Sequence, residues 1–151
     1  MKNYSSVAII AVALSANVLL AQYEIPKNKI NLKGIKCVVT GNAAQDREGT
    51  SAVYKGGKVF FCCRGCPKAF EKDGKKFSAK ANHQLVATKQ AKQVKCVFTK
   101  RRLNPRTQIR VQGVEITFCC SSCMKKSLDS TDQIEMLFND KQFANGYQVR
   151  H

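Results

Sequence analysis

The feature that most constrains the fold of this chain is a cluster of three cysteines that occurs twice. FFCCRGCPKAF spans 60–70 and TFCCSSCMKKS spans 117–127, so the pattern C-C-x-x-C returns fifty-seven residues later. A lone cysteine precedes each cluster, which gives the spacings C-x24-C-C-x2-C and C-x22-C-C-x2-C. Four cysteines in the same order, twice, with nearly the same gap, indicate an internal duplication.

The sequence around the cysteines repeats as well. KCVVTG at 36–41 aligns with KCVFTK at 95–100, and AVYKGGKVFFCCRGC at 52–66 aligns with IRVQGVEITFCCSSC at 109–123. Each half therefore contains a lone cysteine, a spacer and a cysteine cluster in that order.

Each cluster follows a predicted β-hairpin. Glycine supplies the positive φ that a tight hairpin turn requires, and short β-rich runs flank a glycine in both halves. Pro67 directly after the first cluster suits the first turn of a helix. The predicted strands are 53–55 and 58–61 around Gly56-Gly57, then 109–111 and 114–118 around Gln112-Gly113.

Two further helices and a turn are predicted outside the hairpins. Residues 77–93 place Phe77, Ala81, Leu85 and Thr88 at helical spacing, which indicates a basic amphipathic helix that connects the halves. A last helix, capped by Ser130 or Thr131, would carry Ile134, Leu137 and Phe138, and Asn145-Gly146 would mark a turn. We therefore expect an α+β fold of two small tandem treble-clef or zinc-ribbon-like units, each a hairpin and a short helix, joined by a longer helix.

The N-terminus indicates export. Residues 7–20 form an uncharged apolar run of about fourteen residues after Met1-Lys2. That length is short for about 30 Å of hydrocarbon and matches a signal-peptide core, although an uncleaved anchor is the alternative. The predicted location is the periplasm or cell envelope. The predicted divisions are a signal peptide at 1–21, a flexible lead-in at 22–35, the first unit with the connecting helix at 36–92, and the second unit with the C-terminal helix at 93–151.

A cysteine cluster at the start of a helix is well suited to bind a metal ion. The free N–H groups and dipole of a helix N-terminus lower cysteine pKa values, and the thiolate is the form that binds metal. Zn²⁺ accepts tetrahedral sulfur ligands at about 2.3 Å, and soft Cu(I) accepts three thiolates. The pattern therefore predicts a zinc or copper ion as the bound partner.

At these residues the chain resembles the YHS domain and the related TRASH domain, which is named for trafficking, resistance and sensing of heavy metals. The first half carries F-C-x3-C-x3-F after the upstream CVVTG, and the resemblance covers 36–82 and 95–127. It implies a small hairpin-plus-helix metal-binding unit with ligands on the lone cysteine and the C-x3-C pair. Carried over to this sequence, those ligands are Cys37, Cys62 and Cys66, then Cys96, Cys119 and Cys123.

The chain also departs from the family pattern. Val38 and Val97 follow the lone cysteines where the family usually has proline. Lys100 stands where the first half has Gly41, and Ser127 stands where it has Phe70. The second helix is therefore expected to be less firmly anchored than the first.

The remaining cysteines, Cys63 and Cys120, allow two interpretations. Strand alternation would place each on the apolar face of its hairpin, as a buried core cysteine. Each becomes a fourth metal ligand only if the strand has already turned before the cysteine pair. His83 is expected to be a surface residue of the connecting helix, and His151 is assigned no role.

Disulfide bonding is the main alternative to metal binding. In an oxidising compartment, an even number of cysteines in a small chain normally forms a disulfide framework. Cys37 and Cys96 would each pair with a cysteine of their own cluster, and no metal would then be bound. The C-x3-C register favours metal, the compartment favours disulfides, and metal could also bind only to the reduced form.

The sequence offers little to support catalysis. A redox C-x-x-C usually sits on a thioredoxin-like βαβ frame, and no parallel strands with long crossovers are predicted here. The chain has two histidines and no Ser-His-Asp set, paired carboxylates or phosphate loop. We therefore expect a binding protein and not an enzyme.

The positive net charge of the chain indicates which binding partners are expected. The formal net charge is +16, spread along the chain. Nucleic acid is disfavoured because the protein is expected to be exported and lacks aromatic–basic interleaving. An anionic membrane surface or cell-wall polymer is the next candidate. The alternative function is thus a disulfide-stapled envelope protein that binds an anionic partner.

Overall fold

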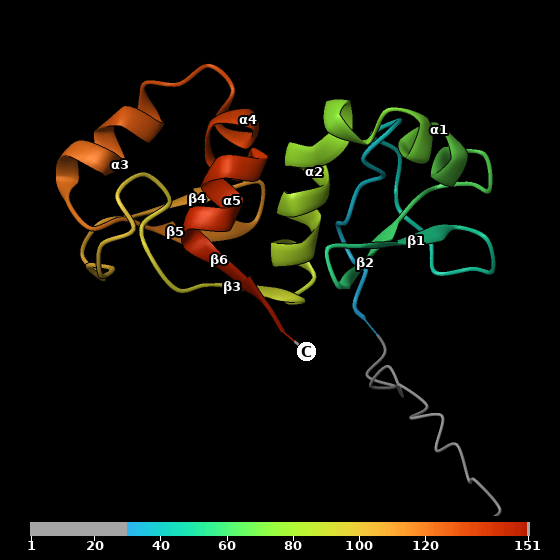
Figure 1. The fold of residues 1–151 in the computed structure, drawn as a ribbon, viewed down its shortest axis with the longest axis horizontal. Helices are drawn as coiled ribbons and strands as arrows, with labels where there is room; N and C mark the ends of the chain where they lie inside the picture. Colours follow the sequence, from blue (N-terminus) through green and yellow to red (C-terminus); the bar gives the residue numbers. More distant parts are fainter. Residues whose placement is uncertain (1–29, 151) are drawn as a thin grey trace, which may run out of the picture.

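The computed structural model describes residues 30–150 (Figure 1). The signal peptide, the lead-in up to residue 29 and His151 lie outside the described residues. In chain order, the elements are β1 (Ser51–Tyr54), β2 (Gly57–Phe60), α1 (Cys66–Lys72), α2 (Gly74–Ala87), β3 (Ala91–Gln93), β4 (Gln108–Val111), β5 (Val114–Thr117), α3 (Ser121–Leu128), α4 (Gln133–Phe138), α5 (Asp140–Gly146) and β6 (Tyr147–Val149).

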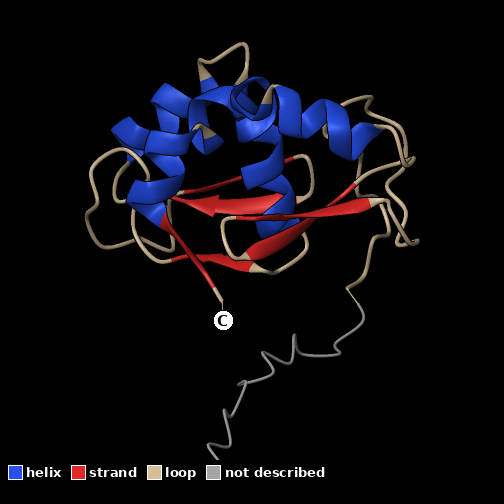
Figure 2. Ribbon diagram, turned by 45° about the vertical axis from the view of Figure 1, so that its right-hand side comes forward, coloured by secondary structure: helices blue, strands red, loops and turns tan. Residues whose placement is uncertain are grey.

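Helix α2 stands at the centre of the molecule. In Figure 1, β1, β2 and α1 lie on one side of α2, and the second hairpin with α3, α4 and α5 lies on the other. Most of the helices lie together on one side of the strands (Figure 2). Within residues 30–150, no helix combines the length and the apolar character that crossing a membrane would need.

The strands form three antiparallel pairs, β1 with β2, β4 with β5, and β3 with β6. The two predicted hairpins each run directly towards a cysteine cluster and then into a short helix, α1 or α3. The expected α+β fold of two hairpin–helix units joined by a longer helix is therefore confirmed.

The first hairpin turns one residue earlier than predicted. Tyr54 pairs with Gly57, so the two-residue turn is Lys55-Gly56, with φ of 49° and 78°. Gly57 is therefore the first residue of β2 and not part of the turn. A Cβ at this position would lie 2.7 Å from Leu85 Cδ2, so the glycine allows the Leu85 side chain of α2 to pack closely against the strand.

The connecting helix is shorter than predicted. It ends at Ala87, and Lys89 then takes a positive φ of 61°. Residues 91–93 form β3, which pairs with β6 near the C-terminus. A local helical pattern could not show this, because the strand partner lies more than fifty residues away.

The C-terminal predictions also need correction. Asp132, and neither Ser130 nor Thr131, caps α4, because its side chain accepts a hydrogen bond from the Glu135 N–H. Asn145-Gly146 is the end of helix α5 and not an isolated turn. Asn139 caps α5 by accepting a 3.1 Å hydrogen bond from the Gln142 N–H.

One hydrophobic core includes residues of both halves and of α2. Ala81 and Leu85 of α2 are fully buried, as the helical spacing predicted. Burial of such side chains stabilises the fold by about 1.5–3 kcal/mol for each large one. The largest fully buried side chains include Phe60, Phe61, Phe118, Phe138, Ile116 and Leu137.

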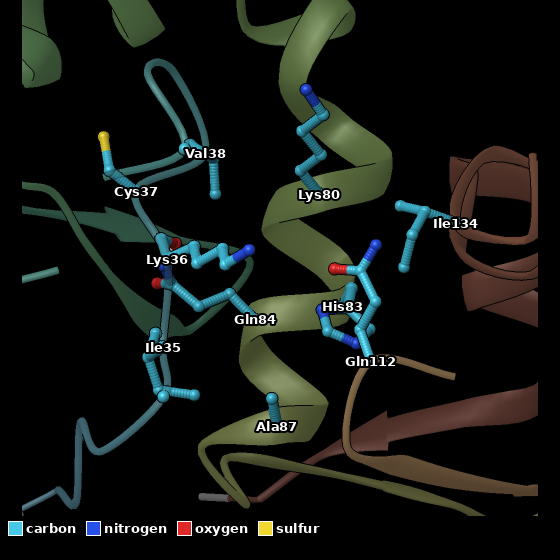
Figure 3. A pocket seen from close by; sticks show the side chains of 12 residues that line it. Ile35, Lys36, Cys37, Val38, Lys80, His83, Gln84, Ala87, Gln112 and Ile134 are labelled. Atoms are coloured by element: carbon cyan, nitrogen blue, oxygen red, sulfur yellow. The ribbon is translucent and has the colours of Figure 1, made fainter. Parts of the chain in front are cut away.

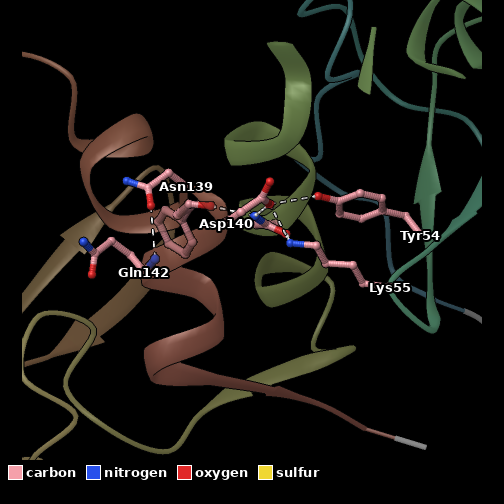
Figure 4. Close-up of polar contacts among 7 residues, drawn as sticks. Tyr54, Lys55, Asn139, Asp140 and Gln142 are labelled. Atoms are coloured by element: carbon pink, nitrogen blue, oxygen red, sulfur yellow. Dashed lines mark hydrogen bonds and ion pairs between the residues drawn. The ribbon is translucent and has the colours of Figure 1, made fainter. Parts of the chain in front are cut away.

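A polar cluster around Asp140 links the two halves (Figure 4). The Lys55 Nζ donates to Asp140 at 2.6 Å, and the Asn82 amide donates to Asp140 at 3.1 Å and to the Phe138 carbonyl at 2.7 Å. The Tyr54 hydroxyl lies 3.5 Å from Asp140. The hydrogen bond from Lys55 lowers the pKa of Asp140. These contacts fix the first hairpin and α2 against the start of α5.

Two glutamine side chains hold the segments that carry the lone cysteines. We call the turn around Cys37 the first knuckle (residues 36–42) and the turn around Cys96 the second knuckle (residues 95–101). Gln84 accepts from the Phe60 N–H at 2.7 Å and donates to the carbonyls of Phe60 and Lys36 at 3.0 and 2.9 Å. Gln93 makes the corresponding bonds to Thr117, at 2.9 and 2.7 Å, and to the Lys95 carbonyl at 3.2 Å. Each glutamine therefore joins a knuckle to its hairpin.

Replacing Gln84 should weaken the fold substantially. Gln84 is 2% exposed, so Gln84→Ala would leave buried backbone groups of β2 without partners. We expect a loss of about 2–3 kcal/mol in the free energy of unfolding, measured by urea denaturation. The exposed Gln148 offers a control, since Gln148→Ala should change stability by less than about 0.5 kcal/mol. Equal effects of the two substitutions would contradict the role of Gln84.

Candidate metal centres

The structure gathers six of the eight cysteines into two triads. In each triad, the three sulfurs lie within 4.8 Å of one another. Each consists of the lone cysteine of a knuckle and the first and last cysteines of a cluster. The six ligands implied by the family resemblance are thus brought together in two sets: Cys37, Cys62 and Cys66, and Cys96, Cys119 and Cys123.

The chain turn between strand and helix assembles each cluster. Strand β2 ends at Phe60, the chain turns through 62–65, and Cys66 begins α1. The Cys62 and Cys66 sulfurs lie 3.7 Å apart, and those of Cys119 and Cys123 lie 3.8 Å apart. Because the strand ends before the cysteine pair, the side chains of the two adjacent cysteines need not point to opposite faces.

The two knuckles have the same hydrogen bonds. The Gly41 N–H donates to the Cys37 carbonyl at 2.8 Å, and the Lys100 N–H donates to the Cys96 carbonyl at 2.8 Å. Gly41 has φ of 80° and Lys100 has φ of 58°, so the lysine adopts the left-handed conformation that glycine adopts in the first unit. The departure at Lys100 therefore does not change the path of the second knuckle.

A threonine hydroxyl contacts each triad at the same place. The Thr40 Oγ1 lies 3.2 Å from the Cys62 sulfur, and the Thr99 Oγ1 lies 3.2 Å from the Cys119 sulfur. Each threonine belongs to the knuckle, three residues after the lone cysteine. The repeated KCVxT sequence is the signal that could have pointed to these residues.

Burial leaves each triad accessible from one side. Cys37 is 2% exposed and Cys96 is 0% exposed, and Cys66 and Cys123 are also buried. Cys62 and Cys119 are only half-buried. Each group of sulfurs is therefore covered by protein on the knuckle and helix sides and is reached from solvent beside the first cysteine of the cluster.

The thiols of a triad differ in proton affinity. Burial acts to raise the pKa of Cys37, but hydrogen bonds from the backbone and hydroxyl of Thr40 outweigh it and lower this pKa to about 7. Burial likewise opposes hydrogen bonds from Thr99 and the Cys119 backbone at Cys96, whose pKa is lowered to about 7. Burial and the neighbouring sulfurs raise the pKa of Cys66. The thiols of Cys37 and Cys96 would thus be partly ionised near neutral pH, and a metal ion would displace the protons that remain on the three sulfurs of each triad.

Cys63 is not a core residue, and Cys120 lies only at the edge of the core. Cys63 is exposed and Cys120 is half-buried, so the expectation that strand alternation buries them is wrong. The cause is the end of each strand before the cysteine pair. The Cys63 sulfur lies 3.4 Å from that of Cys66, and the Cys120 sulfur lies 3.7 Å from that of Cys119. Both lie at the edge of a triad and outside the set of three.

The helix of the second unit is anchored differently from that of the first. Phe70 of α1 packs against Tyr54 and Phe61, with ring centroids 5.4 and 5.5 Å away. Ser127 takes the corresponding place in α3 and is fully buried, and α3 packs against α4. The Gln133 side chain also donates to the Ser127 carbonyl at 3.2 Å. Additional C-terminal structure thus replaces the aromatic anchor.

His83 is not the surface residue that the sequence predicted. Its ring meets Phe138 edge-on at 4.9 Å, and its Nε2 lies 3.4 Å from the Val111 carbonyl. Burial lowers the pKa of His83. The side chain therefore connects α2 to the second unit.

A cavity of about 500 Å³ lies between the first knuckle and α2 (Figure 3). Its lining includes Lys36, Val38, Lys80, His83 and Ile134. Figure 3 shows the Cys37 sulfur pointing away from these side chains. Cys37 also lines the cavity, which therefore adjoins the first knuckle on the side away from the Cys37 sulfur.

No disulfide joins the cysteines. All eight lie within residues 30–150, and each is a free thiol. The sulfur contacts of 3.4–3.8 Å are well beyond the bond length of about 2.05 Å. The disulfide framework considered for an oxidising compartment is not formed in this structure.

Comparison of the chain with protein-family models, with curated proteins and with solved structures finds no significant match. Conclusions about function therefore depend on the geometry of the triads and on the cysteine motifs themselves.

The threonine contact predicts a pH-dependent defect. Thr40→Val removes the hydroxyl that helps to lower the pKa of Cys37, so that pKa should rise towards the ordinary value for cysteine. Metal binding at pH 7 then has to displace a more tightly held proton, whereas above pH 9 the thiolate forms in either protein. We expect the affinity of the first site to fall about threefold to tenfold at pH 7, with a smaller loss at pH 9.

Competition with a chromophoric chelator at the two pH values measures this change. Thr40→Ser keeps the hydroxyl and serves as the control. A loss of affinity that is equal at both pH values would show that Thr40 acts by packing and not through the Cys37 proton.

Proposed function

We propose that the protein binds two soft or borderline metal ions, zinc or copper, one in each cysteine triad. The observation that carries this proposal is the convergence of three sulfurs within 4.8 Å, twice, from corresponding positions of two repeated units. Chance would rarely bring together three cysteines that lie up to twenty-nine positions apart in both halves.

The donor set favours a thiophilic metal. Three thiolates complete a trigonal site for Cu(I), whereas tetrahedral zinc takes one further ligand. The solvent-accessible side beside Cys62 and Cys119 leaves room for that ligand or for exchange with another carrier. An accessible three-sulfur site suits transfer or sensing of a metal better than a purely structural role, for which a closed site is the rule.

The proposal extends to the family and the location of the protein, which are supported by the cysteine motif and by the N-terminal sequence. The F-C-x3-C-x3-F motif, with its lone upstream cysteine, supports a tandem YHS/TRASH-like protein. The apolar run at 7–20 supports export to the periplasm or cell envelope. In this proposal the protein binds its metal and catalyses no reaction.

Serine substitutions should remove one metal at a time. We expect two metal ions per chain for the reduced protein, one for Cys66→Ser, one for Cys123→Ser and none for the double variant, because two sulfurs rarely hold the ion against a competing chelator. Native mass spectrometry after equilibration with Cu(I) or Zn²⁺ counts the ions. The two single variants are matched controls for each other. Two ions in the double variant would refute the ligand assignment.

The basic surface supports a second, compatible activity. Five lysines of α1 and α2 are exposed, and none forms an ion pair with a carboxylate among residues 30–150. Basic side chains near an anionic membrane contribute about 1 kcal/mol each. We propose that these exposed lysines bind anionic lipid. The five residues are Lys68, Lys72, Lys75, Lys76 and Lys80.

Vesicle binding tests this surface. Lys75→Gln together with Lys76→Gln should weaken binding to phosphatidylglycerol vesicles about tenfold or more, because two favourable charges are lost. Binding of the unaltered protein should also fall as salt rises. The control is Lys92→Gln with Lys95→Gln, which removes two exposed lysines at β3 and the second knuckle. Equal losses in both double variants would mean that only the net charge matters.

A further inference from the structure

We infer that Cys63 and Cys120 are relay thiols, through which a metal ion enters and leaves the two triads. This inference rests on the proposed function and assigns a role to the two cysteines that the triads leave out. It makes the accessible side of each centre a route for ligand exchange with an external metal carrier.

The first unit shows the arrangement most clearly. Cys63 is exposed, whereas Cys37 and Cys66 are buried. The Cys63 sulfur nevertheless lies 3.4 Å from the Cys66 sulfur. One side chain therefore touches both solvent and a buried ligand of the centre, which is what a transfer ligand requires.

The second unit matches this arrangement in part, because there the contact joins two half-buried cysteines. Cys120 is half-buried, and its sulfur lies 3.7 Å from the Cys119 sulfur, while Cys96 and Cys123 are buried. The two residues that follow are exposed in both units, Arg64-Gly65 in the first and Ser121-Ser122 in the second. A carrier can therefore approach either relay thiol without displacing a helix or a strand.

The position of the relay thiols distinguishes them from permanent ligands. The three triad sulfurs all lie within 4.8 Å of one another, and Cys63 and Cys120 fall outside these sets. Neither is buried: Cys63 is exposed, and Cys120 is half-buried at the edge of the core. A thiol beside the triad, in contact with one ligand, suits a short-lived coordination step.

The transfer step is a ligand exchange. The Cys63 sulfur binds the incoming ion as it loses its proton to the departing carrier ligand or to water, and one bond between carrier and metal breaks. The ion then forms bonds to Cys66, Cys62 and Cys37 while its remaining bonds to the carrier break, and these thiols release their protons to the carrier ligands or to water. The bond to Cys63 breaks, and that sulfur regains a proton. The oxidation state of the metal does not change.

The experiment follows transfer of Cu(I) from its bicinchoninate complex to the reduced full chain under anaerobic conditions. Stopped-flow absorbance gives the rate, and titration to equilibrium gives the affinity and stoichiometry. The variants are Cys63→Ser, Cys120→Ser and the double variant. Ser122→Ala, at an exposed position of the second cluster, is the control.

We expect Cys63→Ser and Cys120→Ser each to slow one phase of transfer about tenfold or more, because a serine hydroxyl is a much poorer ligand than a thiolate for soft Cu(I) arriving on the carrier. The double variant should slow both phases, and all variants should still bind two Cu(I) ions with affinity within about threefold of the unaltered protein. Ser122→Ala should leave the rates unchanged.

Two results would overturn the relay role while the proposed function stands. Unchanged transfer rates in the double variant would show that the metal reaches the triads directly. A loss of one ion, or of more than about tenfold in affinity, would make Cys63 a permanent ligand, since a true ligand contributes to equilibrium binding. If the unaltered protein binds no Cu(I) and no Zn²⁺, the proposed function itself fails, and the relay fails with it.

Discussion

The cysteine triads depend on two glutamine side chains that join each knuckle to its hairpin. Gln84 and Gln93 each use one amide to bond both backbone groups of a residue two positions before the cysteine pair and a carbonyl next to the lone cysteine. The amide of Gln84 is buried and the amide of Gln93 is half-buried. Loss of the buried bonds is costly, because it leaves polar groups without a partner. The lone cysteine is thereby held against the cluster before any metal binds.

The duplicated units reach the same geometry with different residues. Lys100 adopts the backbone conformation of Gly41, and a buried Ser127 with α4 replaces the aromatic anchor of Phe70. Gln84 follows the first cluster in the chain, whereas Gln93 precedes the second. Both units preserve the placement of the sulfurs, which would bind a metal ion, and of the threonine hydroxyl and knuckle backbone that surround them.

Local patterns in the sequence were enough to predict the two hairpins and the short helices that follow them, because turn glycines act over a few residues, whereas the set of six triad cysteines came from the family resemblance. They could not predict β3, whose partner β6 lies more than fifty residues away, or the roles of Gln84 and Gln93, which occupy no equivalent repeat positions. The exposure of Cys63 was missed because alternation was extended past the end of β2. His83 was misjudged because its contacts come from the second unit.

X-ray absorption at the metal edge would test the central claim most directly. For the reduced protein loaded with Cu(I) or Zn²⁺, the account predicts a first coordination shell dominated by sulfur, at about 2.3 Å for zinc and with about three sulfurs per ion. The Cys66→Ser and Cys123→Ser variants, which each keep one intact triad, should give the same shell. A shell made mainly of nitrogen or oxygen would contradict the account, because the metal would then lie outside the cysteine triads.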